Sequence, residues 1–330
     1  MPKTRHIIIS DKQSALPYSK GLMASSFMAI GLTPAQAFHV AEKLEDDLHL
    51  EGVESITRAD LVTRAHQTLA EEVGSTYARV FAKWQVVRKL GAPLVILLGG
   101  GTGVGKSTLA TQLAARLGIT RIIPTDAIRE VMRGVLSPEV APALHTSSFD
   151  ADRFVQRPLP KPSDPLEVGF REQVMIVGVG IRALARRAVI EGTHLIVEGV
   201  HAIPGILDVD EFRDSAVVVP LIVTIDDEEL HRSHFALRAL ESSTRPGDRY
   251  LDHFEHIRRI QEYVKGLAAD HGTPVVPSYN LDSTLVQIID LVVEAAVRAV
   301  PDDVSGPVPL VGAIDGDTFA QPTQQGRRSP

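Results

Sequence analysis

One short segment restricts the possible folds of this chain more than any other. Residues 100–107 read GGTGVGKS and match GxxxxGK[ST], the pattern of loops that bind nucleotide phosphates. The apolar stretch 94–98 precedes it and the helix-like sequence TLATQLAARLG follows, which is the strand-loop-helix context that separates this motif from a chance glycine-rich turn. Backbone N–H groups of such a loop surround phosphate oxygens, its lysine reaches the β- and γ-phosphates, and its hydroxyl binds Mg2+. The predicted nucleotide contacts are Gly100, Gly101, Thr102, Gly103, Val104, Gly105, Lys106, Ser107 and Thr108, with Ser107 also on Mg2+.

The rest of the chain predicts an α/β P-loop NTPase fold behind a smaller unit. Runs of β-branched and apolar residues alternate with helical periods, which is typical of a parallel sheet with helices on both faces. These runs are 94–98, 120–124, 194–198, 217–225 and 273–276. Residues 1–91 predict one strand at 5–10 and then amphipathic helices, a small and mostly helical domain, with 92–300 as the kinase-type domain. Residues 301–330 have little to bury and predict a disordered tail.

Local signals place several helix ends and one close contact. Thr33-Pro34 and Thr57 fit helix starts, and Asp164-Pro165 fits the start of a long helix toward residue 191. Gly178 and Gly180 lie inside that long helix, where glycine is costly, so they predict close packing against another element.

Composition excludes several classes of protein. The chain has 330 residues, 34 Lys and Arg against 41 Asp and Glu, a net charge of -7, and no cysteine. Disulfides, cysteine nucleophiles and thiolate metal sites are therefore excluded, and a cytoplasmic protein is expected. The chain has no arm rich in Lys and Arg, which argues against nucleic acid as a partner. Its longest apolar stretches fall well short of the roughly 18 residues that span a membrane. No Asn-Lys-x-Asp element of switch GTPases occurs either.

Charged residues follow two of the predicted strands at the sheet edge where ligands of open α/β folds bind. Asp126 ends the second strand, and Arg129 and Arg133 follow at helical spacing. A carboxylate at this position can orient or deprotonate an acceptor hydroxyl, and arginines can bind an anionic group on the same acceptor. The alternative interpretation is a helix-capping aspartate followed by solvated charges. Glu198 ends the third strand and is predicted to hold Mg2+. His201 either contacts substrate or caps the strand turn.

A basic region after the fourth strand fits a mobile lid, which phosphoryl transfer uses to exclude water. It contains Arg238, Arg245 and Arg249, and an ordinary charged surface helix is the alternative interpretation.

Five segments in order resemble the archaeal-type 2-phosphoglycerate kinase family. They are LPYSKGL at 16–22, PTDAIREVMR at 124–133, HTSSF at 145–149, IVEGVH at 196–201 and IRRIQ at 257–261. The resemblance implies an ATP-dependent kinase that phosphorylates the free hydroxyl of 2-phosphoglycerate to give 2,3-bisphosphoglycerate. It also implies an N-terminal unit similar to an ATP-cone, with Lys12 and Lys20 as phosphate contacts, unless these are isolated surface lysines.

The resemblance adds Ser147 and Ser148, which either bind the acceptor or form a polar turn. The predicted catalytic residues are Lys106, Asp126, Arg129 and Arg238. The predicted substrate contacts are Asp126, Arg129, Arg133, Ser147, Ser148, His201, Arg245 and Arg249. Two alternatives stay open: a kinase for another small phosphorylated or phosphonate acceptor, and a non-catalytic nucleotide-sensing regulator. A homo-oligomer is compatible with either.

Overall fold

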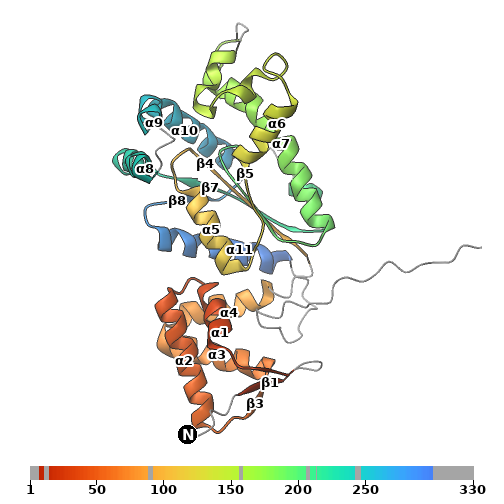
Figure 1. Ribbon diagram of the computed structural model, residues 1–330, viewed down its shortest axis with the longest axis vertical. Coiled ribbons are helices and arrows are strands. Elements are labelled where there is room, and N and C mark those ends of the chain that lie inside the picture. Colours follow the sequence, from red (N-terminus) through yellow and green to blue (C-terminus); the bar gives the residue numbers. More distant parts are fainter. Residues whose placement is uncertain are drawn as a thin grey trace, which may run out of the picture.

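The computed structural model describes residues 7–10, 15–87, 92–155, 159–205, 209–212, 214–241 and 247–299 (Figure 1). Lys12, Arg245 and the segment 301–330 lie outside these residues, as does the side chain of Arg238.

A five-stranded parallel sheet forms the centre of the larger part of the molecule. Its strands are β4 (Leu94–Gly100), β5 (Ile122–Pro124), β6 (Leu195–Glu198), β7 (Val217–Thr224) and β8 (Val275–Pro277). Their order is β5-β6-β4-β7-β8, so the strand that leads into the phosphate loop is central. Because all pairs are parallel, the carboxyl ends of the strands meet at one edge. The predicted α/β fold is confirmed for this part.

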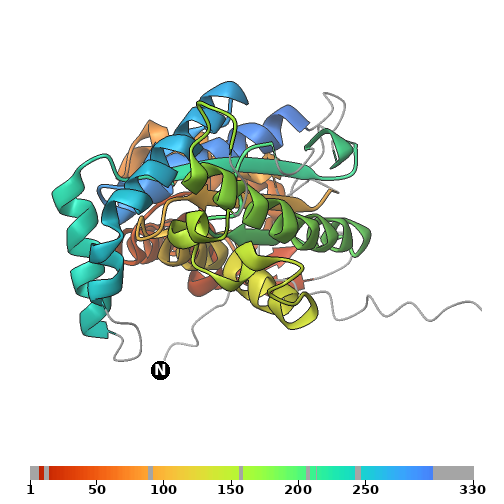
Figure 2. The same ribbon diagram turned by 90° about the horizontal axis from the view of Figure 1, so that it is seen from above.

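Helices cover both faces of the sheet (Figure 2). Their bounds are α5 (Lys106–Leu117), α6 (Thr125–Val135), α7 (Pro165–Ile190), α8 (Glu228–Glu241), α9 (Gly247–Asp252), α10 (Phe254–Asp270) and α11 (Leu281–Ala299). Successive residues of β4 point to opposite faces of the sheet. Ile96 and Leu98 pack with α5 and α11 on one face, whereas Val95 and Leu97 pack with α6 and α7 on the other. Burial on both faces explains why this strand is apolar throughout rather than alternating.

The N-terminal unit is not the mostly helical unit predicted from the sequence. It contains a three-stranded mixed sheet, β2-β1-β3, formed by β1 (Ile8–Ser10), β2 (Ala15–Pro17) and β3 (Ser55–Thr57). β1 pairs antiparallel with β2 and parallel with β3. Four helices accompany the sheet: α1 (Lys20–Met28), α2 (Pro34–Leu50), α3 (Arg58–Glu72) and α4 (Ser75–Val87). β1 lies within the strand predicted at 5–10, whereas β2 and β3 were missed because each has only three residues and too few buried positions to set a periodicity.

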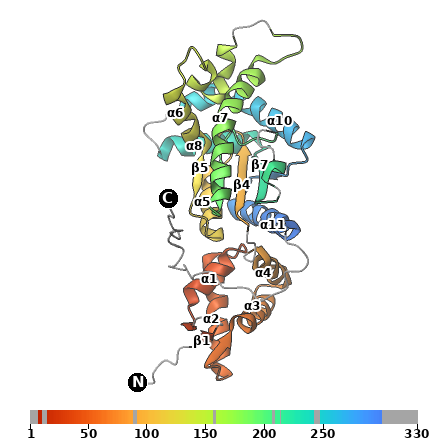
Figure 3. The ribbon, with the colours of Figure 1, turned by 90° about the vertical axis from the view of Figure 1, so that its right-hand side faces the viewer.

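The N-terminal unit and the larger part share one hydrophobic core. Helix α4 packs against α11, and α1 lies against α5 (Figure 3). At this junction Gly31 has φ +98°, and a Cβ on it would lie 2.9 Å from Cγ2 of Val286 in α11. The turn after α1 therefore needs glycine both for its left-handed backbone and for its close approach to α11.

Several local predictions are confirmed. Thr33 and Gln36 form a capping box at the start of α2, and the Asp164 carboxylate accepts from the Leu166 N–H at the start of α7. Gly180 lies against α6, where a Cβ would meet Cγ2 of Ile128 at 2.4 Å. Across the described ranges, none of the helices is long and apolar enough to cross a bilayer.

Candidate functional site

The phosphate loop joins the end of β4 to the start of α5. Gly103 and Gly105 have φ of +87° and +86°, which lets the loop curl in a way that L side chains rarely allow. Lys106 is only 7% exposed, and its Nζ donates to the Gly101 carbonyl at 2.6 Å across the mouth of the loop. The Ser107 hydroxyl donates to Oε1 of Glu198 at 2.9 Å. The loop thus holds the ammonium, the hydroxyl and a strand-end carboxylate together.

Three side chains of helix α8 contact the phosphate loop. His231 Nε2 lies 2.8 Å from the Thr102 carbonyl, and His234 Nδ1 lies 3.0 Å from that of Gly103. A Cβ on Gly103 would lie 2.4 Å from the Phe235 ring, so the backbone rests directly on this side chain. Burial lowers the pKa of His231 to about 4, and the neutral ring donates from Nε2 to the loop. Three residues of one helix therefore fix the shape of the phosphate loop.

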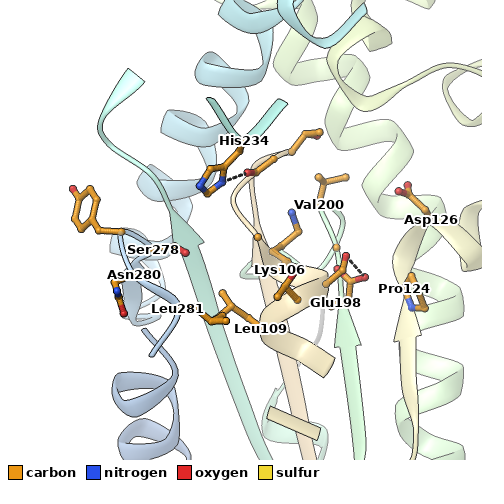
Figure 4. Close-up of a pocket in the computed structure, with 17 residues that line it drawn as sticks. Lys106, Leu109, Pro124, Asp126, Glu198, Val200, His234, Ser278, Asn280 and Leu281 are labelled. Carbon is orange, nitrogen blue, oxygen red and sulfur yellow. Dashed lines mark hydrogen bonds between the residues drawn. The ribbon is translucent and has the colours of Figure 1, made fainter. Parts of the chain in front are cut away.

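A cavity of about 380 Å3 opens beside the loop at the carboxyl edge of the sheet (Figure 4). Lys106, Glu198 and Asp126 reach it from three neighbouring elements. The strand register produces this grouping, because Glu198 pairs with Leu98 on one side and with Pro124 on the other. Glu198 thus lies between the phosphate loop and the start of α6, where Asp126 is found.

The residues of α6 differ in where they point. The Asp126 side chain is 70% exposed and lines the cavity, with Arg129 Nε 3.8 Å from its Oδ1. Arg129 Nη1 donates to the Thr146 carbonyl, while its buried Nε has no hydrogen-bond partner. Arg133 instead pairs with Glu130 on the same helix, and its buried Nε also has no hydrogen-bond partner. Neither arginine is among the residues that line the cavity, so the structure brings Arg129 beside Asp126 at the cavity edge and leaves Arg133 one turn further along α6.

His201 is fully buried and does not line the cavity. Its Nδ1 lies 2.9 Å from Thr125 Oγ1 and its Nε2 lies 2.9 Å from Gln173 Oε1. Burial lowers the pKa of His201 to about 3, so the ring is neutral. Both ring nitrogens have partners within the protein, which favours a structural role; a contact of this side chain with substrate stays a prediction and would require these hydrogen bonds to break.

Ser147 and Arg249 meet at a buried carboxylate. Arg249 Nη2 donates to Ser147 Oγ at 3.0 Å and to Asp150 Oδ2 at 3.2 Å, and His253 Nε2 lies 2.7 Å from Asp150 Oδ1. Ser148 is buried. The serine segment and the region of α9 and α10 are thus in contact, although neither Ser147, Ser148 nor Arg249 lines the cavity.

The structure adds cavity residues that the sequence interpretation missed. Residues 278–281, which run from the end of β8 to the first residue of α11, line the side of the cavity next to Leu109 and His234. The Asn280 carboxamide oxygen accepts from the N–H groups of Asp282 and Ser283, which caps α11. The sequence feature that could have indicated these residues is their position directly after the last predicted strand, because the carboxyl ends of the strands form the edge where ligands of open α/β sheets bind.

Lys20, predicted as a phosphate contact, is paired in the structure. Its Nζ lies 3.2 Å from Glu42 Oε1 and 3.3 Å from Glu45 Oε2, and the hydrogen bond to Glu42 is the main cause of its raised pKa.

The donors beside the loop fit Mg2+. Among the residues that the structure describes, no three His, Asp or Glu side chains form a metal-binding group. Magnesium in nucleotide sites is held by one or two protein oxygens together with phosphates and water, so the Ser107 hydroxyl and the Glu198 carboxylate form a suitable pair.

Comparison with curated proteins gives close relatives over most of the chain. It is 37% identical over 292 residues to 2-phosphoglycerate kinase of Methanopyrus kandleri, covering 88% of each chain. It is 38% identical over 282 residues to 2-phosphoglycerate kinase of Thermococcus kodakarensis, covering 85% of this chain and 94% of the relative. The chain belongs to the 2-phosphoglycerate kinase family. A third member, from Methanothermobacter thermautotrophicus, is 35% identical and covers 88% of this chain.

Other comparisons are distant. No family model matches the chain. A solved structure of a putative kinase from Chloroflexus aurantiacus aligns over 61% of this chain and 96% of its own, with 14% identity and a TM-score of 0.35. A gluconokinase from Sinorhizobium meliloti aligns over 63% of this chain and 93% of its own, with 14% identity and a TM-score of 0.33.

Proposed function

We propose that this protein transfers the γ-phosphoryl group of ATP to the free hydroxyl of 2-phosphoglycerate, giving 2,3-bisphosphoglycerate and ADP. The observation that carries the proposal is one cavity with the phosphate loop and Glu198 on one side and Asp126 on the other, in a chain of this family. A phosphoryl donor and an anionic alcohol need these two sets of groups at neighbouring positions.

On the donor side, the loop N–H groups and Lys106 bind the β- and γ-phosphates. Ser107 and Glu198 would hold Mg2+, which would neutralise the charge that develops on the phosphoryl oxygens. Lys106 is already held at the mouth of the loop by the Gly101 carbonyl, so little rearrangement is needed to meet a phosphate. Residues 278–281 lie at the far end of the same cavity and are the proposed site of the nucleobase.

On the acceptor side, Asp126 orients the substrate hydroxyl and accepts its proton. The hydroxyl oxygen then bonds to the γ-phosphorus as the bond from that phosphorus to the bridging oxygen of ADP breaks. Arg129, whose buried Nε lies near Asp126 but makes no hydrogen bond, binds the phosphate or carboxylate of the acceptor. Catalysis then comes from positioning and charge stabilisation, as expected for phosphoryl transfer.

Other predicted roles remain part of the proposal. Arg129, Arg133, Ser147, Ser148 and Arg249 do not line the cavity, so their contact with substrate requires a closure that brings them toward it; the sequence of the proposed lid also contains Arg238 and Arg245. The N-terminal residues 1–91 are proposed as an ATP-cone-like regulatory domain in front of a kinase domain at 92–300. Lys20 would have to leave Glu42 and Glu45 to bind a nucleotide there.

The test is ADP release from MgATP by the purified protein with 2-phosphoglycerate, 3-phosphoglycerate, glycerate or no acceptor. We expect stimulation by 2-phosphoglycerate and its loss, by at least about 100-fold, in Lys106→Ala. Equal stimulation by all acceptors would reject the substrate, and wild-type turnover in Lys106→Ala would reject the mechanism.

A further inference from the structure

A buried chain of hydrogen bonds connects the acceptor side of the cavity to the strand that holds Glu198. Its members are Thr125 at the start of α6, His201 after β6, and Gln173 in α7, and all three side chains have essentially no exposure to solvent. None of them lines the cavity. The hydrogen-bonding capacity of each side chain determines which atom donates in each of these hydrogen bonds.

Gln173 determines the direction of the chain. Its Nε2 donates to the carbonyls of Ala143 at 2.6 Å and Thr146 at 3.1 Å, which uses both amide hydrogens. Its Oε1 can then only accept, so the nitrogen of His201 that it meets, Nε2, must carry the proton. The reversed amide would point its oxygen at two carbonyl oxygens, which is repulsive.

The tautomer of His201 in turn determines what Thr125 does. A neutral ring with its proton on Nε2 has a bare Nδ1, so the Thr125 hydroxyl must donate to it across 2.9 Å. Thr125 is the first residue of α6, directly after the N-cap residue Pro124. Thr125 also lies directly on the strand end: a Cβ on Gly199 would fall 1.9 Å from its Oγ1.

We propose that Thr125, His201 and Gln173 act as a positioning chain that sets the start of α6, and with it Asp126 and Arg129, relative to Glu198 and the phosphate loop. Asp126 follows Thr125 directly. Arg129 donates to the same Thr146 carbonyl that accepts from Gln173, so both proposed acceptor groups are tied to the chain. The fixed tautomer of His201 determines the donor and the acceptor of each hydrogen bond in this connection. Loss of one of these hydrogen bonds would displace the bound acceptor rather than the nucleotide.

The inference rests on the proposed function for its kinetic test, and Thr125→Val is the sharpest variant. It keeps the shape and removes only the hydroxyl. We expect kcat/KM for 2-phosphoglycerate to fall about tenfold while KM for ATP stays within about twofold, because only the acceptor groups are displaced. Thr125→Ser keeps the donor and is expected to recover most of the loss.

A matched control separates positioning from general destabilisation. Thr68→Val removes a buried threonine hydroxyl from α3, where it donates to the Arg64 carbonyl far from the cavity. It is expected to leave both kinetic parameters as in the wild type. The proposal would be wrong if Thr125→Val left kcat/KM for 2-phosphoglycerate unchanged. It would also be wrong if this variant lowered kcat/KM for 2-phosphoglycerate and for ATP by the same factor.

A second measurement does not depend on the substrate. Imidazole nitrogen chemical shifts report the tautomer directly, with the His201 signals assigned by their absence in His201→Gln. We expect the neutral form with its proton on Nε2 in the wild type at pH 7. A proton on Nδ1, or a charged ring, would overturn the chain even in an active enzyme. If the wild type phosphorylated no acceptor, the proposed function would fail, whereas the tautomer would still decide the inference.

Discussion

At the scale of single residues, the roles proposed for Asp126 and Arg129 can be tested separately, because the proposal assigns them to different parts of the acceptor. Asp126 is exposed to the cavity and has no role in packing, so its loss should affect chemistry more than folding. We expect Asp126→Asn to lower kcat at least about 100-fold, since the amide can still accept a hydrogen bond from the hydroxyl but cannot take its proton, with little change in KM for ATP. Steady-state ADP release measures this, and an unchanged kcat would exclude Asp126 from proton transfer.

Arg129 offers a test of binding rather than of chemistry. We expect Arg129→Ala to raise KM for the acceptor about 10- to 100-fold, because a charge-assisted hydrogen bond to an anion is lost. Arg129→Lys keeps the charge but not the planar fork and should give an intermediate KM. The KM values are compared by acceptor titration at saturating ATP. Equal values for Arg129→Ala and the wild type would show that the acceptor anion binds elsewhere.

At the scale of elements, helix α8 carries a pH-dependent contribution to stability. In the folded protein burial lowers the pKa of His231 to about 4, against 6.5 for an ordinary histidine. Between these values the unfolded chain binds a proton that the folded chain does not, so stability is lost as pH falls from about 6.5 toward 4 and is unaffected above pH 7. His201, with its pKa lowered to about 3, acts in the same direction.

Urea unfolding at pH 7 and pH 4.5 tests this contribution. We expect His231→Gln, which can still donate to the Thr102 carbonyl, to remove about 2 kcal/mol of the wild-type loss between the two pH values. His66→Gln, in the partly exposed middle of α3, serves as the control and should keep the wild-type pH dependence. An undiminished loss in His231→Gln would show that this histidine is not held neutral.

The elements also show what a sequence can reveal. The strand-loop-helix motif, the caps at Thr33 and Asp164, and the acidic strand end at Glu198 are set by neighbours in sequence, so their patterns predicted them. The role of His201 depends on Thr125 and Gln173, which lie 76 and 28 residues away and meet it only through the fold. Short strands such as β2 leave too little buried surface for a pattern.

At the scale of the whole molecule, the shared core predicts that the N-terminal unit and the catalytic part unfold together. Trp84 is the only tryptophan of the chain, lies in α4 at the junction, and is 4% exposed. Its fluorescence therefore reports the junction, whereas far-ultraviolet circular dichroism reports the helices of the entire molecule. We expect the two unfolding transitions to coincide, because separating the parts would expose the apolar faces of both α4 and α11.

Ligand linkage makes this prediction sharper. Nucleotide bound at the phosphate loop should stabilise the junction although it does not touch it: at 100 times the dissociation constant, MgATP should raise the free energy of unfolding by about 2.7 kcal/mol in both signals. Lys106→Ala should remove the part of both shifts that comes from nucleotide at the phosphate loop. A shift in circular dichroism without one in Trp84 fluorescence would show that the two parts unfold independently. A shift that survives in Lys106→Ala would instead mean that nucleotide is held outside the phosphate loop, as the proposed role of the N-terminal unit requires.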